Sequence, residues 1–464
     1  MNYKKDLVFL NSILIFSLCL TSFFCFETIK EVDGNDSQNN NINLKTSDVE
    51  TGDYHWVYNT SWDASSNDWA LDMALDDNNN VYITGRTEGA TQDALIAKFD
   101  ANGQEVWNTT FDGGDYDRGY GITSDDSDNI YIAGQTVNTS DSNYNAFIAK
   151  YDSSGNYLWN VTWDGISGSS DSAQDIMLDA SGNIYIAGKT RNTEDDLFIA
   201  KFDISQNLVW NTTWDSGFNE RVFGMALDDS HNIYVTGELW TSQADILVAK
   251  FNSTGHEEWN ITLDSGYGNE IGKRIVLDDT KNICIAGYFK NSSGLDQFLV
   301  AKFDNAGNQE WNHTWDGGRG SDQALDLTID DLNNIYAVGA TDLNSEVIIK
   351  KIDDQGTEKW NITYNGEWSD IQGNAITLDD AENIYIAGDY NKQQDAFIAK
   401  YQEIILDENP LNEENPDDDA ATGDITPTNA AAIPGYSLTV LISAVSISLI
   451  VILIKSIKML KVNR

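Results

Sequence analysis

The stretch Ile130-Tyr131-Ile132-Ala133-Gly134, followed by Phe147-Ile148-Ala149-Lys150-Tyr151, recurs with small changes seven times in this chain of 464 residues. Counterparts of the first run begin at Val81, Ile184, Ile233, Ile283, Ile335 and Ile384. Both runs are rich in β-branched and aromatic residues, are too short for helices, and are bounded by Asp, Asn and Gly. The sequence therefore predicts two strands per repeat that are buried on both faces.

Each repeat also carries a tryptophan, and these tryptophans follow one another at a period of about 50 residues, which indicates one repeated supersecondary unit. They are Trp56, Trp107, Trp159, Trp210, Trp259, Trp311 and Trp360. With the tryptophan strand and a short run such as Gly121-Ile122-Thr123, each repeat has four short strands. Repeated four-stranded sheets bury both faces most simply by radial arrangement. We therefore expect an all-β fold, a seven-bladed β-propeller of four-stranded antiparallel blades, over residues 53–401.

The two ends of the repeat region complement each other. The chain enters with the Trp56 strand, which is the fourth strand type, and no such strand follows the last buried run, which ends at Tyr401. We predict that the Trp56 strand pairs with Ala396 to Tyr401 and closes the ring. The Asp-Asp-x-x-Asn and Asp-x-x-Gly segments between strands are typical of tight hairpin turns.

The chain resembles a known family in the string Leu178-Asp179-Ala180-Ser181-Gly182-Asn183-Ile184-Tyr185-Ile186-Ala187-Gly188 and in Leu197 to Asp203 behind it. These residues are similar to the SBBP-type β-propeller repeat of bacterial and archaeal surface or secreted proteins. The resemblance implies a fold and an extracytoplasmic setting, and no agreed activity. Asp-x-x-Gly-x-x-x-Trp, as in Asp100 to Trp107, is also similar to the structural tryptophan-docking motif of quinoprotein propellers. Their adjacent-cysteine pair has no counterpart in this sequence.

The segments on either side of the repeats indicate where in the cell the protein is placed. Residues 1–26 hold an apolar run behind Lys4 and Lys5 and are expected to be a signal peptide or an N-terminal anchor, and residues 27–52 a polar linker. Residues 402–433 are expected to form an acidic stalk, 434–454 a transmembrane helix and 455–464 a basic cytoplasmic tail. Because the basic side stays in the cytoplasm, we expect a single-pass cell-membrane protein with its propeller outside the cell.

The chain is strongly acidic, with 74 acidic and 28 basic residues and a formal charge of −46. This charge excludes nucleic acid as a partner and is typical of a solvated, aggregation-resistant surface. We expect contact with the membrane through the C-terminal helix and with an unidentified extracellular protein or carbohydrate. Cys284 is the one cysteine within the repeats, so they contain no pair for a disulfide.

Asparagine triplets suited to N-glycosylation recur on the tryptophan strands. Six have the form Trp-Asn-x-Thr, and a seventh, slightly shifted, ends at Ser61. In an exported glycoprotein these are candidate acceptor sites, and an outward-facing Asn and Thr alternation on an edge strand explains the same pattern. The candidate asparagines are Asn59, Asn108, Asn160, Asn211, Asn260, Asn312 and Asn361.

Signals for catalysis or metal binding are weak. The four histidines share no spacing, so we assign no catalytic residue, no metal ligand and no cofactor. Calcium is possible, but the Asp-Asp-x-x-Asn segments lack the ligand order and the distal glutamate of a calcium loop, which favours hairpin turns.

One set of loops varies between repeats in length and residue type, which favours it as a ligand-binding face. Aromatic and charged residues in or beside these loops suit carbohydrate or protein ligands, and covering the blade ends would explain them equally well. They are Tyr116, Arg118, Phe218, Arg221, Trp240, Tyr267, Tyr288 and Trp368. We expect a cell-surface binding, adhesion or envelope-structural module. The alternative is an extracellular propeller enzyme, a hydrolase, lyase or quinone-dependent enzyme, that uses the same face.

Overall fold

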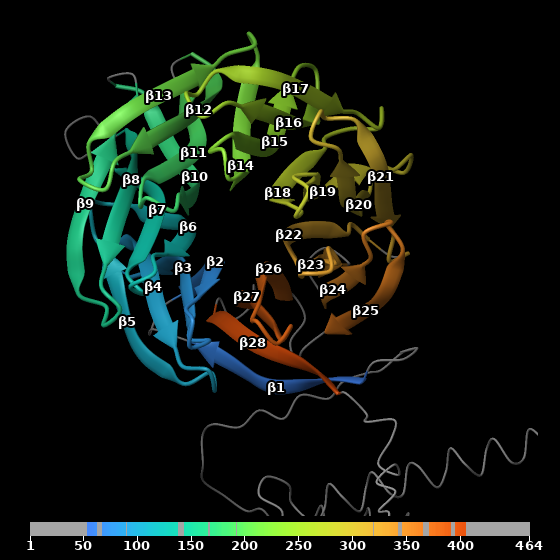
Figure 1. The fold of residues 1–464 in the computed structure, drawn as a ribbon, viewed down its shortest axis with the longest axis horizontal. Coiled ribbons are helices and arrows are strands. Elements are labelled where there is room, and N and C mark those ends of the chain that lie inside the picture. The colour runs from blue at the N-terminus through green and yellow to red at the C-terminus, as the bar shows by residue number, and fades with distance from the viewer. Residues whose placement is uncertain are drawn as a thin grey trace, which may run out of the picture. The chain divides into compact units, whose positions relative to one another are not determined.

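The computed structural model describes residues 53–404, apart from 63–66, 90, 138–142, 166–167, 192, 319, 342–345, 365–370 and 391–394. Over this part, the chain forms 28 strands in seven antiparallel sheets of four. Figure 1 shows the sheets arranged radially around a central axis, and we call the region between the first strands of the blades the channel. The seven-bladed propeller predicted from the repeats is therefore confirmed.

Each of the first six blades consists of four consecutive strands, which follow one another from the channel to the rim. Blade 1 is β2–β5: Asn67–Leu75, Val81–Glu88, Gln92–Phe99 and Glu105–Phe111. Blade 2 is β6–β9: Asp117–Ser124, Ile130–Val137, Tyr144–Tyr151 and Tyr157–Trp163. Blade 3 is β10–β13: Ser170–Leu178, Ile184–Arg191, Asp195–Phe202 and Leu208–Trp214.

Blade 4 is β14–β17: Asn219–Leu227, Ile233–Trp240, Ala244–Phe251 and Glu257–Leu263. Blade 5 is β18–β21: Ile271–Leu277, Ile283–Lys290, Asp296–Phe303 and Gln309–Trp315. Blade 6 is β22–β25: Gln323–Ile329, Ile335–Thr341, Glu346–Ile352 and Glu358–Tyr364. Blade 7 is β26 (Ile371–Leu378), β27 (Ile384–Tyr390), β28 (Asp395–Ile404) and, at the rim, β1 (Asp53–Trp62).

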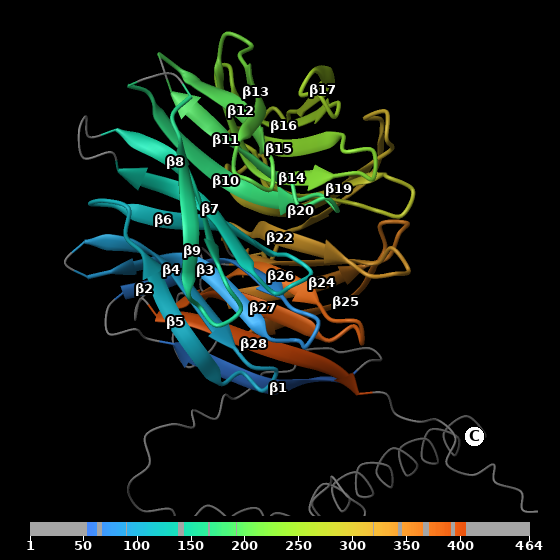
Figure 2. The same cartoon turned by 60° about the vertical axis from the view of Figure 1, so that its left-hand side comes forward.

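Blade 7 joins the two ends of the propeller. β1 pairs antiparallel with β28, from Asp53 opposite Ile404 to Trp62 opposite Ala396, and both views show the two strands side by side (Figures 1 and 2). The predicted ring closure is thus confirmed. One detail differs, because a bulge after Trp56 places Tyr58 opposite Lys400, as Trp107 lies opposite Lys98 in blade 1. Tyr58, and not Trp56, is the structural counterpart of the repeat tryptophans, and Asn59 then matches Asn108 without any shift.

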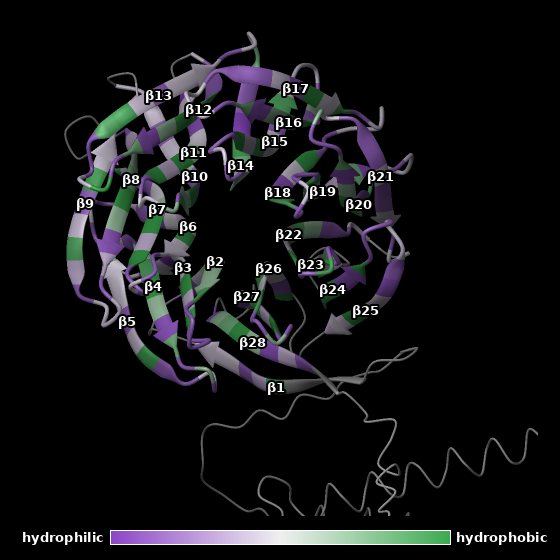
Figure 3. Cartoon of the chain, viewed as in Figure 1, coloured by the Kyte–Doolittle hydropathy of each residue, from purple (hydrophilic) through white to green (hydrophobic). Residues whose placement is uncertain are grey.

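The core lies between the blades, on the middle strands. In β11, Ile184, Tyr185, Ile186 and Ala187 are all buried, because neighbouring blades cover both faces of the sheet. The rim strands instead alternate exposed and half-buried residues, and in Figure 3 hydrophilic residues dominate β17 and β21.

The repeat tryptophans pack against the next blade. A Cβ added to Gly155, whose φ is 81°, would lie 2.7 Å from the ring of Trp107. The indole nitrogen of Trp107 donates to the carbonyl of Ser153 in the same turn, at 3.2 Å. The Asp-x-x-Gly turn therefore receives the tryptophan of the preceding blade, which is a structural role.

Several predicted segments lie outside the described residues, namely the N-terminal segment and linker, nearly all of the acidic stalk, the transmembrane helix and the basic tail. A search of the described residues for a helix long and apolar enough to cross a membrane finds none.

Candidate functional site

The two ends of the channel differ. We call the end bearing the hairpin turns, such as residues 76–80 and 100–104, the hairpin face. We call the end bearing the loops between blades and between the two middle strands, such as residues 112–116 and 241–243, the loop face. Hydrogen bonds cap the hairpin turns in a repeated way: the Asp179 carboxylate accepts from the backbone N–H groups of Ser181 and Asn183 and pairs with Lys201. The hairpin-turn interpretation of these aspartates agrees with this geometry.

Four charged residues from four blades meet on the channel axis and form the axial cluster. Arg274 of β18 lies 3.5 Å from Asp72 of β2, 3.5 Å from Asp175 of β10 and 3.1 Å from Asp326 of β22, measured between nitrogen and carboxylate oxygen. The aspartates also tie blades together. The backbone N–H of Ile122 in blade 2 donates to Asp72, that of Met225 in blade 4 to Asp175, and that of Ile376 in blade 7 to Asp326, at 2.7–2.9 Å.

The axial cluster holds three carboxylates against one guanidinium. Burial raises the pKa of Asp72 to about 7 and that of Asp326 to about 6, although Arg274 lowers both. The position that carries Asp72, Asp175, Arg274 and Asp326 in their blades is a glycine in blades 2 and 4, Gly121 and Gly224. A larger residue would crowd the cluster, because a Cβ on Gly121 would lie 3.0 Å from the backbone of Asp175. The cluster has a structural role, since its ion pairs and hydrogen bonds join blades across the ring.

A second group of residues, the arginine patch, lies on the loop face at the junction of blades 1 and 2. It contains Trp69, Arg86, Gln92, Tyr116 and Arg118. The Arg86 guanidinium stacks 3.9 Å above the ring of Trp69, its partner across the β2–β3 ladder. Arg118 donates through Nε to the Gln92 side chain, which in turn donates to Glu88 at 3.0 Å. Tyr116 forms an isolated bridge with Gln92 and is 53% exposed.

The two arginines of this patch have acidic groups near them but make no direct ion pair. Neither Arg86 nor Arg118 forms an ion pair with any residue in the described part of the chain, and Nε of Arg86 is buried without a hydrogen-bond partner. Burial lowers the pKa of Arg86 and the positive charge of Arg118 lowers it further, while the carboxylates of Glu88 and Asp389 oppose the shift. Two neighbouring guanidinium groups without a direct ion pair in a protein of charge −46 are a candidate site for an anion.

Two other cations near the axis give a comparison. Arg221 is bound to Asp195 at 2.6 Å and to Glu238 at 3.0 Å, so its charge is neutralised. Lys273 resembles the patch arginines in forming no ion pair with a described residue, but it lies against the ring of Phe223, 4.5 Å from its centroid, and burial lowers its pKa. All five arginines of the described residues lie on the first or second strand of a blade, namely Arg86, Arg118, Arg191, Arg221 and Arg274.

The structure brings some of the predicted binding residues together and separates others. Tyr116 and Arg118 belong to the arginine patch. Phe218, Arg221 and Trp240 lie together at the loop face of blade 4, where Trp240 opposes Asn219. Tyr267 is exposed in the loop that leads into blade 5, and Tyr288 lies on β19 of that blade, opposite Ile271. Trp368 lies outside the described residues.

Sequence reasoning missed Trp69 and Arg86, which complete the patch. Arg86 follows the glycine that ends each Ile-Tyr-Ile-Ala-Gly-like run, and its counterparts are Gln135, Lys189, Glu238, Tyr288, Ala340 and Asp389. Variation at this one position beside an invariant glycine within the repeats is the signal that could have found it.

The predicted acceptor asparagines lie at the rim. Asn108, Asn160, Asn211, Asn260, Asn312 and Asn361 are exposed on the outermost strands, and Asn59 is half-buried on β1. This placement agrees with both interpretations of the triplets.

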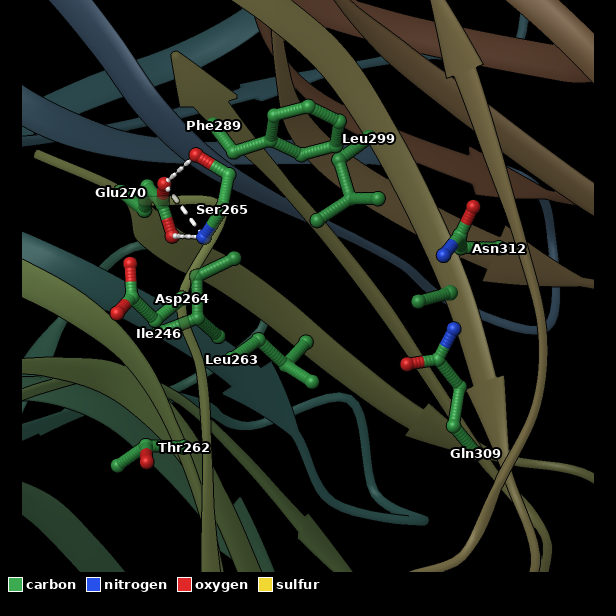
Figure 4. A pocket seen from close by; sticks show the side chains of 11 residues that line it. Ile246, Thr262, Leu263, Asp264, Ser265, Glu270, Phe289, Leu299, Gln309 and Asn312 are labelled. Carbon is green, nitrogen blue, oxygen red and sulfur yellow. Dashed lines mark hydrogen bonds between the residues drawn. The ribbon is translucent and has the colours of Figure 1, made fainter. Parts of the chain in front are cut away.

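A pocket of about 350 Å³ lies between blades 4 and 5 (Figure 4). Leu263, Phe289 and Leu299 form an apolar wall, and Asp264, Ser265 and Glu270 stand at one side. Glu270 is occupied, because it accepts hydrogen bonds from the backbone and hydroxyl of Ser265. The pocket lacks a cationic lining residue, which distinguishes it from the arginine patch.

Comparison with known proteins reveals a shared fold. No family model matches the chain, and no curated protein sequence matches it. The resemblance to SBBP-type repeats therefore remains an expectation. Among solved structures, the chain is similar to a polysaccharide lyase of family PL25, an ulvan lyase bound to -[GlcA(1-4)Rha3S]-. That match has 13% sequence identity and a TM-score of 0.50, and it covers 73% of this chain and 95% of the lyase. The protein YCF48 bound to D1 peptide matches at 10% identity and a TM-score of 0.47, covering 77% of this chain and 97% of YCF48. At these identities the matches show the fold alone: the chain is a seven-bladed β-propeller.

Proposed function

We propose that this protein is a binding module displayed outside the cell, and that its arginine patch takes an acidic polysaccharide. The observation that carries the proposal is the pair Arg86 and Arg118, which lack an ion-pair partner among the described residues although the chain has a charge of −46. A strongly acidic protein has carboxylates to spare for pairing. Leaving two adjacent guanidinium groups without one favours an external anion.

The residues around these arginines suit a sugar polymer. A guanidinium group donates two parallel N–H bonds to a carboxylate or sulfate, so Arg86 and Arg118 would hold the acidic groups. Tyr116 exposes 53% of its surface beside them, and an exposed aromatic ring packs against the apolar face of a sugar. Trp69 holds Arg86 in place by stacking.

The overall charge shapes the expected binding. A net charge of −46 repels a polyanion at long range, so attraction must come from contacts within the patch. Added salt screens both the repulsion and the local attraction. We therefore expect affinity to change less with salt than it does for a basic binding protein.

The similar ulvan lyase, whose structure holds an acidic sugar, supports the class of ligand without transferring any residue. The apolar segments 7–26 and 436–454 and the basic end of the chain support display outside a membrane. Protease added to intact cells should then release a soluble fragment that contains all seven repeats. Protection of the repeats would contradict this orientation.

The binding proposal is tested with the purified full-length protein and a polyuronate or a sulfated glycan, measured by titration calorimetry. Arg86→Gln and Arg118→Gln should each weaken binding about tenfold, because a charged hydrogen bond contributes about 1.5–3 kcal/mol. Arg191→Gln is the matched control, since Arg191 is an exposed arginine already bound to Asp195 at 2.6 Å. Equal losses in all three variants, or no binding by the parent protein, would contradict the proposal.

The enzyme alternative gives a different outcome in the same mixture. A lyase would convert the polymer to unsaturated uronate products that absorb ultraviolet light. If products form and their formation depends on Arg86 and Arg118, the patch is a catalytic site and not only a binding site.

A further inference from the structure

Three clusters of carboxylates repeat at blade junctions on the loop face. Each combines one residue at the start of a blade's third strand, one just after its fourth strand, and one at the start of the next blade. One oxygen from each member lies within 4.8 Å of the oxygens of the other two. The clusters are Asp93–Asp112–Asp117, Asp196–Asp215–Glu220 and Asp245–Asp264–Glu270.

These clusters contain no cation of their own. None of their nine carboxylates forms an ion pair with a lysine, arginine or histidine in the described part of the chain. Their neighbours are one another. Burial raises the pKa of Glu220 to about 7, and the carboxylates of Asp196 and Asp215 raise it further.

A second observation points to a missing ligand. Glu220 is fully buried, and its Oε2 has no hydrogen-bond partner among the described residues, while Oε1 accepts from Ser216. Asp117 is equally buried, but its carboxylate has partners, because the hydroxyl of Thr136 lies opposite it and lowers its pKa, and Oδ2 accepts from the backbone of Gly113 and Gly114. Buried carboxylate oxygens are rarely left without a partner, so the Glu220 cluster has room for one.

Two other junctions have an amide at the same position. Asn145 and Gln297 replace the third-strand aspartate in blades 2 and 5, whereas blades 6 and 7 keep an acid, Glu346 and Asp395. The Gln297 side-chain amide donates to Asp316 at 3.3 Å, so an N–H group lies where the other clusters have a third carboxylate. The third cluster is intermediate. Gln243 donates to Asp264 at 3.1 Å, and both oxygens of Glu270 are occupied by Ser265, as Figure 4 shows.

We propose that Ca²⁺ binds at the Asp196–Asp215–Glu220 cluster. All the side-chain donors are oxygens, which suits a hard cation and disfavours zinc. Ca²⁺ accepts irregular coordination by carboxylates and backbone carbonyls, whereas Mg²⁺ requires a near-octahedral shell. Bound there, the ion joins two strands of one blade to the first strand of the next. This is the junction of blades 3 and 4, which Asp175 also joins at the axis.

The test uses the full-length protein stripped with a chelator and titrated with CaCl₂, and it follows both heat and thermal unfolding. We expect a rise in melting temperature with saturating Ca²⁺ and a smaller rise with MgCl₂. Glu220→Gln should lower the stoichiometry by one ion. Asp171→Asn, which changes the matching buried acid at an amide-containing junction, should leave it unchanged.

A further variant separates loss of the ion from loss of the fold. Asp215 is exposed, so Asp215→Asn should weaken Ca²⁺ binding while the chelated protein melts as the parent does. The proposal is overturned if Ca²⁺ leaves the melting temperature unchanged. It is also overturned if Glu220→Gln keeps the full response, or if Mg²⁺ acts equally. The site lies between blades 3 and 4 and the arginine patch between blades 1 and 2, so this test is independent of whether the patch binds a glycan.

Discussion

Acidic side chains on the hairpin face are paired with cations, whereas those at the axial cluster and at the junction clusters of the loop face are paired incompletely or not at all. On the hairpin face, most turn aspartates between the first and second strands have a lysine close to them, as in Asp76 with Lys98 at 3.4 Å and Asp278 with Lys302 at 2.8 Å. At the axis, three aspartates share Arg274, and at the junction clusters three carboxylates share no cation at all. The ratio of carboxylates to cations is therefore about one in the hairpin turns and three in the axial cluster, and the junction clusters have carboxylates without any cation.

The pKa values follow this ratio. Burial opposes ionisation of Asp125, but hydrogen bonds from Asn129 and Lys150 outweigh it and lower its pKa to about 2. Burial raises the pKa of Asp72 to about 7, because Arg274 is divided among three partners. The hairpin face stabilises the fold through charged pairs, whereas the axial cluster and the junction clusters hold negative charge that is at most partly compensated.

Removing the axial cation should have the largest effect. Arg274→Met leaves Asp72, Asp175 and Asp326 buried without a counter-charge, and we expect a loss of about 3–5 kcal/mol in the free energy of unfolding. Denaturant unfolding at neutral pH measures it. Adding Asp72→Asn to this variant should recover part of the loss, and an unchanged stability would show that the arginine is dispensable.

A hairpin-face lysine should matter somewhat less. Lys302 is 2% exposed between Asp278 and Asp354, so Lys302→Met leaves Asp278 buried without its cation. We expect a loss of about 2–3 kcal/mol. The control is Lys281→Met, because Lys281 pairs at 3.8 Å with an exposed aspartate, Asp229, and should cost less than about 0.5 kcal/mol. Equal effects would remove the distinction between buried and exposed pairs.

The two regions should give stability opposite dependences on pH. Turn aspartates such as Asp125 have lowered pKa values, so their contribution is present above about pH 4 and is lost as pH falls toward 2. Asp72 and Asp326, which face Arg274 and Asp175, have raised values, so the folded state binds more protons and stability falls as pH rises from about 4 to 7. Chelated protein should be most stable between about pH 4 and 6, and Asp72→Asn should flatten the decline by about 1 kcal/mol.

The rim offers an uncharged reference with the smallest effect. Thr162 is exposed on β9, so Thr162→Val should change the free energy of unfolding by less than about 0.5 kcal/mol. If Asn160 carries a glycan in the native host, the variant loses sugar at that asparagine alone, as glycopeptide mass spectrometry would show. Unfolding of the variant would mean that this threonine packs inside.

The sequence by itself determined the number of blades, the order of strands and the closure of the ring. These features follow from local properties: runs such as Ile184 to Gly188 are too apolar and too short for anything except buried strands, and Asp179 specifies its own turn. The inner strands were predicted too short, as Gly121 to Thr123 in place of Asp117–Ser124, because Asp117 and Arg118 interrupt the apolar pattern.

Only the tertiary structure decided which charges meet. Asp72, Asp175, Arg274 and Asp326 lie far apart in sequence, and Arg86 and Arg118 belong to different repeats, so no spacing along the chain relates them. Their contacts exist because radial packing turns the first strand of every blade toward one axis. The position of a residue within its repeat determines how far along the channel the residue lies. Which residues of other blades it faces across the channel is determined only by the closed ring.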